Sequence, residues 1–209
     1  RLTFNGVSEI TLLGQNVNAY RGIMDNGDIA DFSLLLEYVA EIKEIKRIRF
    51  TTSHPNEMTD SLINCFGSID KLAKTIHLPI QSGSDRVLSA MKRNYTTLEY
   101  KLIIRKIRKV CPEISLTSDF IVGFPNETDK EFRSTIKIME DLEFDYSFSF
   151  LYSPRPGTPA SYIEDSIPNE IKQQRLKELK NINVSQGKAY TQSMQGTKQR
   201  VLFDHYSKI

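Results

Sequence analysis

The chain has 209 residues, of which 39% are apolar and 26% are charged, and its formal net charge at pH 7 is +2. This composition indicates a globular protein with enough apolar material for one sizeable core, and it disfavours a disordered chain. No run of about 18 uncharged apolar residues and no secretory signal pattern is present, so we expect no membrane insertion and a cytoplasmic location. The small net charge does not by itself argue for a nucleic-acid partner.

The first residue and the cysteines bear on the extent and chemistry of the protein. The chain starts at Arg1 rather than at Met and enters a strand within a few residues, so we expect a segment upstream of it. Cys65 and Cys111 lie far apart and form no metal-ligand spacing. We expect both to be buried free thiols.

Strand and helix signals alternate along the chain. The expected strands are rich in β-branched and aromatic residues, and they span 7–13, 47–53, 75–80, 116–122 and 145–152. Helices are expected to begin near residues that suit a cap or a first turn, namely Asp31, Thr59, Ser84, Thr96, Thr128 and Pro168. The loop at 15–22 after the first strand is unusually rich in amide side chains, and Pro79 weakens the third strand.

Two helices have capping boxes, which pair Thr96 with Glu99 and Thr128 with Glu131. The inward face of the first is expected to consist of Leu98, Leu102, Ile103, Ile107 and Val110. That of the second is expected to consist of Phe132, Ile136, Met139 and Leu142.

Asp119 stands out in the fourth strand. It precedes Phe120–Val122, an apolar run typical of a strand buried on both faces, and Gly123 and Pro125 then end the strand. A carboxylate in such a strand must be hydrogen-bonded or paired, because leaving it bare costs several kcal/mol. The pattern leaves open whether Asp119 holds a turn or contacts a ligand.

The last third of the chain changes character. The fifth strand alternates polar and aromatic residues and runs into the proline-rich segment 153–159. The helix after Pro168 is very polar and is expected to continue as a weak amphipathic tail at 187–195. A turn and a strand of an incomplete module are expected at 196–203.

Alternating strands and helices predict a parallel sheet, either an open doubly wound sheet or a barrel. In both folds ligands bind at the carboxyl ends of the strands. The polar residues expected to meet on that rim are Gln15, Asn16, Thr52, Ser53, Gln81, Ser82, Asp119 and Arg155. These residues include no Ser/His/Asp set and no metal cluster. His54 and His77 could act as acids or bases, or they could be core residues whose ring nitrogens are hydrogen-bonded. A cofactor would therefore have to supply the chemistry.

Five stretches carry a resemblance to a known family. They read EITLLGQNVNAYRG (9–22), FTTSHP (50–55), HLPIQSGS (77–84), DFIVGFP (119–125) and YSPRPGTPA (152–160). The chain resembles the MiaB-type tRNA methylthiotransferases, a branch of the radical S-adenosylmethionine (SAM) superfamily. The last four stretches resemble methylthiotransferases in general, and the Gln15–Tyr20 loop resembles the MiaB type in particular.

The resemblance implies an α/β fold, a partial (β/α)6 barrel of parallel strands whose first strand is missing here. It implies SAM and two four-iron, four-sulfur clusters as cofactors. The implied partners are a tRNA anticodon stem-loop and an electron donor, and neither DNA nor a membrane is expected as a partner. The implied reaction adds a methylthio group to C2 of N6-isopentenyladenosine next to the anticodon. An aromatic C–H is too strong and too weakly acidic for acid-base chemistry, so a radical must abstract the hydrogen. An anticodon-loop base is already single-stranded and can therefore be splayed into a pocket.

The sequence departs from the family in one decisive respect. It lacks the Cys-x-x-x-Cys-x-x-Cys motif, and neither Cys65 nor Cys111 replaces it. Because thiolates hold iron–sulfur clusters, we expect this chain alone to bind no cluster and to be inactive. The implied domains are the radical SAM core at 1–165, a connecting helix at 166–195 and the incomplete start of a TRAM-like RNA-binding domain at 196–209.

The resemblance also implies roles for single residues. Gln81 and Asp119 would contact the SAM ribose. Arg93 would contact the methionine carboxylate, for which Lys92 is the competing residue. Thr52 and Ser53 would contact the methionine amine. Ile121, Val122, Leu151 and Tyr152 would edge the adenine, and Gln15, Asn16 and Arg155 would contact the substrate. For Asn16 and Asn18 a loop-stabilising role is equally open.

Three other functions remain open. A sister methylthiotransferase would act on threonylcarbamoyladenosine in tRNA or on a ribosomal-protein aspartate, but the Gln15–Tyr20 loop argues against both. A non-catalytic RNA-binding barrel would follow if the natural protein began at Arg1. A metal-independent barrel enzyme would need an acid-base pair on the rim that the sequence does not offer.

Overall fold

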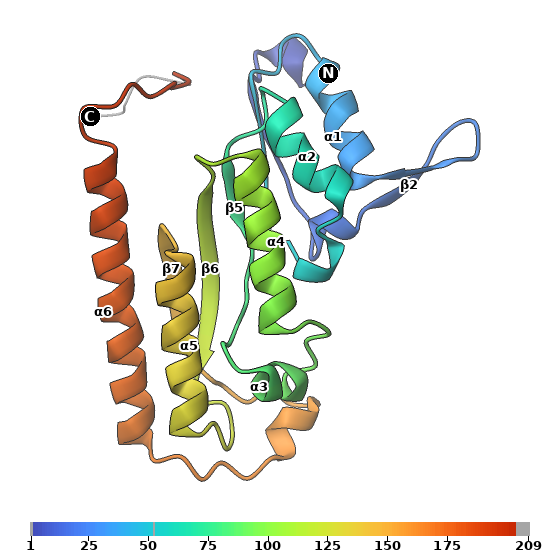
Figure 1. Ribbon diagram of the computed structural model, residues 1–209. Helices are drawn as coiled ribbons and strands as arrows, with labels where there is room; N and C mark the ends of the chain where they lie inside the picture. The colour runs from blue at the N-terminus through green and yellow to red at the C-terminus, as the bar shows by residue number, and fades with distance from the viewer. Residues whose placement is uncertain (1, 52, 204–209) are drawn as a thin grey trace.

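The computed structural model describes residues 2–51 and 53–203 and is built around five parallel strands (Figure 1). These are β1 (Glu9–Leu12), β4 (Arg47–Phe50), β5 (Thr75–His77), β6 (Ser115–Val122) and β7 (Tyr146–Leu151). Strand β1 pairs with β4, and β6 pairs with both β5 and β7, all in parallel. A parallel bridge between Ile48 and Leu72 joins the two groups. The strands thus follow one another in chain order, as in a β/α barrel, and no described pairing closes the sheet between β1 and β7.

Helices connect successive strands and cover one face of the sheet (Figure 1). They are α1 (Phe32–Glu41), α2 (Asp60–Ser68), α3 (Asp85–Ala90), α4 (Thr97–Val110), α5 (Asp129–Leu142) and α6 (Asn169–Ser193), with short 3-10 turns η1 (Thr3–Asn5), η2 (Val17–Ala19), η3 (Pro55–Glu57) and η4 (Pro159–Tyr162). The predicted caps at Asp31, Thr96 and Thr128 and the predicted helix starts near Thr59 and Ser84 are confirmed. Asp31, Thr59, Ser84, Thr96 and Thr128 each accept a backbone N–H of the following helix, and both capping boxes form.

Burial alternates along the strands and defines two faces. In β6 the side chains of Leu116, Ser118, Phe120 and Val122 are buried under the helices, whereas the alternate ones are partly exposed. Asp119 belongs to the second set, and we call the face it occupies the inner face. The core lies between the outer face and the helices, and all four residues predicted for α5 are buried in it.

Several elements differ from the sequence-based predictions. The loop predicted at 15–22 leads into an antiparallel hairpin of β2 (Arg21–Ile23) and β3 (Ile29–Asp31), which turns at Gly27 with φ +86°. Strands of three residues are too short to produce a readable periodicity. The helix expected from Pro168 into the tail at 187–195 is one continuous helix, because α6 runs through Gly187 to Ser193. Residues 197–203 contain no strand, and the rest of the predicted module lies outside the described residues.

The inward face predicted for α4 is partly wrong. Leu98 and Leu102 are exposed, and Tyr100 and Ile104 are buried in their place. The Tyr100 hydroxyl donates a hydrogen bond of 2.7 Å to the Leu78 carbonyl, so its ring occupies the face nearest the sheet. Within the described residues, no helix combines the length and apolarity that spanning a membrane requires.

Candidate cofactor site at the carboxyl ends of the strands

The segment 78–81 carries Gln81 to the side of Asp119. Beyond β5 the chain stays hydrogen-bonded to β6, with Leu78 N donating to Thr117 O and Gln81 N to Asp119 O, both at 2.9 Å. The Tyr95 hydroxyl supports this segment from the helix side through a bond of 3.1 Å to Ile80 O. Pro79, which lacks an N–H, interrupts the pattern, so β5 ends early while its path continues.

Gln81 has a strained backbone. Its φ is +77°, in the left-handed region that residues other than glycine rarely adopt, and its side chain is largely buried. Such a conformation costs about 1 kcal/mol or more and persists only where neighbouring contacts impose it, most often at ligand sites. Here the backbone bonds to Asp119 and Ile121 on β6 impose it.

Asp119 lies on the inner face and is not buried within the sheet. Its side chain is 26% exposed, and Oδ2 lies 3.5 Å from Nε2 of His77. The other ring nitrogen of His77, Nδ1, is 3.0 Å from the Thr117 hydroxyl. The carboxylate thus lies beside the His77 ring and stays accessible to water, which answers the cost of placing it in an apolar strand.

The loops after β1 and β4 are tied together by Asn18. Its amide nitrogen donates to His54 O and its amide oxygen accepts from His54 N, each at 2.9 Å, and the side chain is buried. Asn18 therefore stabilises the loop. Ser53, next to this tie, is buried, and its hydroxyl has no described partner, whereas Thr52 lies outside the described residues. A buried hydroxyl without a partner marks a place for a ligand group.

Arg93 lies in the turn between α3 and α4, close to these loops. Burial lowers the pKa of His54, and the positive charge of Arg93 lowers it further. Burial raises the pKa of Tyr95 to about 12, against the effect of the same Arg93 charge. The turn that carries Arg93 contacts the loop after β4, because Asn56 Nδ2 donates to Asn94 O at 3.1 Å, and the neighbouring Lys92 is exposed.

The residues expected to edge an adenine do not all face the same way. Ile121 and Leu151 are half-buried, and the Tyr152 ring packs edge-on against Phe124 at 5.0 Å with a buried hydroxyl that has no described partner. The Val122 side chain is fully buried in the core, because successive strand residues alternate between faces. Leu151 is paired with Val122 in the sheet and packs against the same core, and Val122 O already accepts from Tyr152 N at 2.8 Å.

Other predicted rim residues are only partly brought together. Ser82 does not reach the rim, because it is fully buried and its hydroxyl accepts from Ser84 N at 3.2 Å beside α5. Gln15 and Asn16 are exposed after β1, and Arg155 is exposed after β7. Their contact with a substrate stays a prediction.

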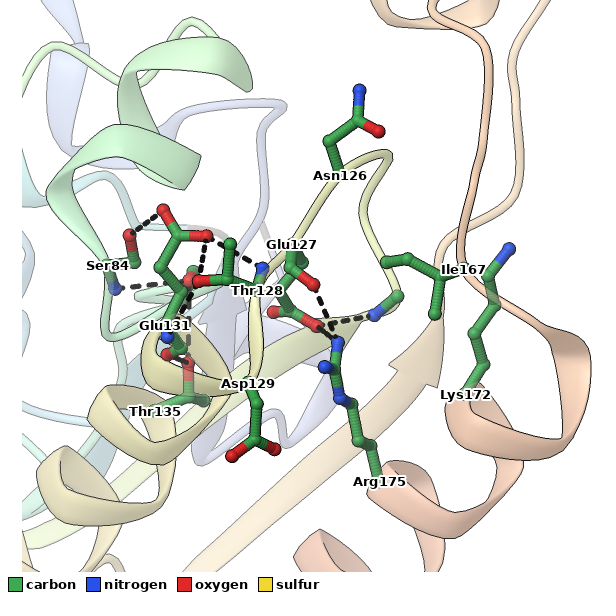
Figure 2. A network of polar contacts seen from close by, with 12 residues as sticks. Ser84, Asn126, Glu127, Thr128, Asp129, Glu131, Thr135, Ile167, Lys172 and Arg175 are labelled. Carbon is green, nitrogen blue, oxygen red and sulfur yellow. Dashed lines mark hydrogen bonds and ion pairs between the residues drawn. The ribbon is translucent and has the colours of Figure 1, made fainter.

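Sequence reasoning missed a buried ion pair beside the loop after β6. Arg175 of α6 donates from Nη1 to the carboxylate and to the backbone oxygen of Glu127, each at 3.0 Å (Figure 2). The same carboxylate oxygen accepts Gly123 N at 3.0 Å. Burial raises the pKa of Glu127, and the Gly123 N–H and Arg175 oppose that shift. Since α6 is polar throughout, no sequence signal separates Arg175 from its charged neighbours.

The lack of a side chain at Gly123 allows α6 to approach this loop closely. Its φ is +70°, and an added Cβ would lie 2.8 Å from Cγ of Lys172. Figure 2 also shows Glu131 on the opposite side of the loop, where its carboxylate contacts Ser84 and Thr128. Glu131 also pairs with Arg86. The loop after β6 is therefore held by α6 on one side and by α3 and α5 on the other.

The described residues do not fit an iron–sulfur cluster. No group of three or more His, Cys, Asp or Glu that could hold a metal occurs among residues 2–51 and 53–203. Cys65 and Cys111 are buried, as predicted, and burial raises the pKa of Cys65 to about 11, so its thiol stays protonated at neutral pH. SAM fits better, because the unpartnered Ser53 and Tyr152 hydroxyls supply the hydrogen-bonding groups that its polar ends require.

Comparisons with known proteins agree with this arrangement. The model of the radical SAM superfamily matches residues 1–139. The chain is 59% identical over 207 residues to the tRNA-2-methylthio-N(6)-dimethylallyladenosine synthase of Methylobacillus flagellatus and 58% identical to that of Chromobacterium violaceum. Each alignment covers 99% of this chain and 47% of the relative, so the chain spans about half the length of these relatives.

A solved structure shares the fold. Coproporphyrinogen III oxidase from Escherichia coli, described as a radical SAM enzyme, matches with a TM-score of 0.59 at 17% identity, over 74% of this chain and 37% of that one. The predicted partial barrel of parallel strands is thereby confirmed. With the superfamily model covering most of the strand and helix units described above, the chain belongs to the radical SAM superfamily.

Proposed function

We propose that this chain is the core of a methylthiotransferase that modifies C2 of N6-isopentenyladenosine next to the anticodon in tRNA. The observation that carries the proposal is the identity of 59% and 58%, over nearly the whole chain, to proteins named as synthases of that nucleoside. The proposed partners are the tRNA anticodon stem-loop and an electron donor, and the proposed location is the cytoplasm. The cluster ligands are proposed to lie outside this chain, which alone would be inactive.

The inner rim is proposed to bind SAM. Gln81 N bonds to Asp119 O beyond the end of β5, and the two side chains would hold the ribose hydroxyls. The Arg93 guanidinium would pair with the methionine carboxylate in the geometry that favours arginine over lysine. The remaining contacts are assigned to Thr52 and Ser53 for the methionine amine, and to Ile121 and Tyr152 for the adenine.

These residues would bind and orient, without exchanging protons with the substrate. SAM, when bound, supplies the radical chemistry that removes hydrogen from an unreactive aromatic carbon. The packed rings of Phe124 and Tyr152 would exclude water from the adenine end of the site. Gln15, Asn16 and Arg155, exposed at opposite edges of the open sheet, would contact the substrate.

The test uses the product of the complete coding sequence, reconstituted with iron and sulfide under anaerobic conditions. The protein is incubated with SAM, a reductant and tRNA that carries isopentenyladenosine without the methylthio group, and the digested nucleosides are analysed by mass spectrometry. We expect conversion of isopentenyladenosine to its 2-methylthio form. Transfer only to threonylcarbamoyladenosine or to a protein aspartate would favour the sister enzymes, and RNA binding without any transfer would favour a non-catalytic barrel.

A further inference from the structure

The chain beyond β5 contains one residue more than the stretch of β6 beside it. His77 lies level with Thr117. The next bridge joins Gln81 to Phe120, so the three residues at 78–80 lie opposite the two residues at 118–119. An extra residue of this kind is a β-bulge, which is rare between parallel strands and re-aims the side chains that follow it. The bulge directly precedes Gln81.

The bulge helps to decide where the Gln81 side chain points. In an uninterrupted strand the side chains at 77, 79 and 81 would share one face of the sheet. The extra residue breaks this alternation, and the φ of +77° at Gln81 then turns the chain again. A bulge disrupts the ladder and a left-handed residue other than glycine is strained, and both features are over-represented beside functional sites. Their occurrence together indicates that the direction of the Gln81 side chain serves a function.

Side-chain hydroxyls replace the backbone partners that the bulge removes. Ser118 of β6 accepts from Ile80 N and donates to Leu78 O, each at 3.0 Å. The Tyr95 hydroxyl lies 3.1 Å from Ile80 O and 3.3 Å from Pro79 O. Within residues 2–51 and 53–203 no other donor reaches these two carbonyl oxygens. The half of the bulge next to Gln81 therefore depends on Tyr95 for its hydrogen bonds.

The Tyr95 ring joins the bulge to the loop after β4. It is buried and packs edge-on against the His54 ring, with 5.5 Å between the two centroids. His54 follows Ser53, whose buried hydroxyl has no partner among the described residues. One side chain thus contacts both the segment that ends in Gln81 and the loop that carries Ser53. A phenylalanine ring would fill the same space, so the hydroxyl is the group that ties this ring to the bulge.

We propose that Tyr95 is a positioning residue of the cofactor site. Its hydroxyl fixes the bulge that aims Gln81, and its ring holds that bulge against the loop of Ser53. The inference rests on the proposed function, because it concerns side chains that are assigned there to SAM. Tyr95 contacts no ligand in this arrangement and acts through Gln81. A tyrosine that only stabilised the fold would leave the SAM affinity of the folded protein unchanged.

Tyr100 supplies a matched control. Its hydroxyl is also buried and also donates to a backbone carbonyl, Leu78 O, at 2.7 Å. Leu78 O keeps Ser118 as a second donor, and Leu78 N stays bonded to Thr117 O of β6. Tyr95→Phe and Tyr100→Phe each remove one buried hydroxyl, so both should lower the free energy of unfolding in urea. Only Tyr95→Phe should weaken SAM binding.

The experiment titrates SAM into the complete, reconstituted gene product at a temperature where every variant is folded. The dissociation constant should rise about 3- to 10-fold in Tyr95→Phe, the loss expected for one neutral hydrogen bond, and should stay nearly unchanged in Tyr100→Phe. Gln81→Ala should weaken SAM binding by itself. Because Tyr95 acts through Gln81, adding Tyr95→Phe to Gln81→Ala should have no further effect on the affinity.

Unchanged SAM affinity in Tyr95→Phe would overturn the inference and reduce Tyr95 to a residue that stabilises the fold. Equal weakening by Tyr95→Phe and Tyr100→Phe would do the same, as would an undiminished effect of Tyr95→Phe in the Gln81→Ala background. Unchanged affinity in Gln81→Ala would overturn the inference while leaving the tRNA reaction of the parent protein intact. A parent protein that neither binds SAM nor modifies tRNA would remove the inference together with the proposed function.

Discussion

At the scale of single residues, position 81 combines a backbone conformation that favours glycine with a glutamine side chain that is assigned to the cofactor. With φ at +77°, glycine suits the backbone there better than any L-residue. We predict that Gln81→Gly is more stable than Gln81→Ala by about 1 kcal/mol, the reverse of the usual order of these residues outside the left-handed region. Urea denaturation of both variants measures this difference. A more stable alanine variant would show that the backbone is not held in the left-handed region.

Arg93 gives a second prediction at the same scale, and Lys92 provides its control. If Arg93 pairs with the methionine carboxylate, Arg93→Ala removes a charge-assisted hydrogen bond worth about 1.5–3 kcal/mol. The dissociation constant for SAM should then rise by about 10- to 150-fold in titrations of the complete, reconstituted protein. Lys92→Ala changes the same charge on an exposed neighbour and should leave the affinity nearly unchanged. Equal effects of the two substitutions would reduce Arg93 to a general electrostatic role.

The site was predictable from sequence where a motif fixes the backbone path. Gln81 and Asp119 follow strands that the β-formers reveal, and the backbone of Gln81 bonds to that of Asp119, with Gln81 in register with Phe120. Ser82 and Val122 lie next to them in sequence but point elsewhere, because the strand pleat and the turn after Gln81 decide the direction of each side chain. The Glu127–Arg175 pair joins residues 48 positions apart, and no local pattern encodes such a contact.

At the scale of elements, helix starts were predictable and helix faces less so. A cap is a local hydrogen bond between residues three positions apart, so Thr96 and Thr128 could be identified without the rest of the fold. Which face of α4 is buried depends on the sheet beneath it, where the Tyr100 hydroxyl finds the Leu78 carbonyl. The hairpin of β2 and β3 escaped prediction because its strands have only three residues each.

Glu131 links two elements and gives a prediction of pH dependence. The hydrogen bond from Arg86, with further help from Thr128, lowers the pKa of Glu131 to about 2 from its usual 4.5. A carboxyl whose pKa is lower in the folded state stabilises the protein above its unfolded pKa, and this stabilisation is lost as the pH falls toward the folded pKa. Because the Arg86 side chain is 52% exposed, solvent screening limits the contribution to about 1 kcal/mol at neutral pH. The free-energy difference between the parent and Glu131→Gln should therefore shrink as the pH is lowered from about 5 toward 3.

Glu99 is the matched control for this pH dependence. It occupies the same position in the capping box of α4, but its pKa is lowered only by Thr96, and its side chain lies in solvent. Denaturation of Glu99→Gln over the same pH range should show a weaker dependence than that of Glu131→Gln. A difference between parent and Glu131→Gln that stays constant with pH would contradict the assigned role of Arg86.

At the scale of the whole molecule, the alternation of strands and helices predicted a parallel sheet, because parallel strands need crossover connections. It left the strand order open between a doubly wound sheet and a barrel, and only the resemblance to a known family implied the barrel. The sequence could not show that the inner face stays open between β1 and β7, because strand signals do not say which strands pair. Among the described residues these two strands are not paired. Nor could it show that α6 packs on the loop after β6, through the side chains of Lys172 and Arg175.

The buried Glu127–Arg175 pair is predicted to couple α6 to the barrel. Removing one partner strands a charge in a dry environment, so Glu127→Gln and Arg175→Met should each cost roughly 3 kcal/mol or more. The double variant strands no charge and should cost clearly less than the two single costs added, with a coupling of about 1–3 kcal/mol. Lys101 and Asp141 form an exposed pair at 2.7 Å between α4 and α5, and their coupling should stay below about 1 kcal/mol. Equal coupling in the two cycles, measured by urea denaturation, would mean that α6 is not anchored through this pair and that only its apolar contacts, such as the fully buried Leu179, hold it to the sheet.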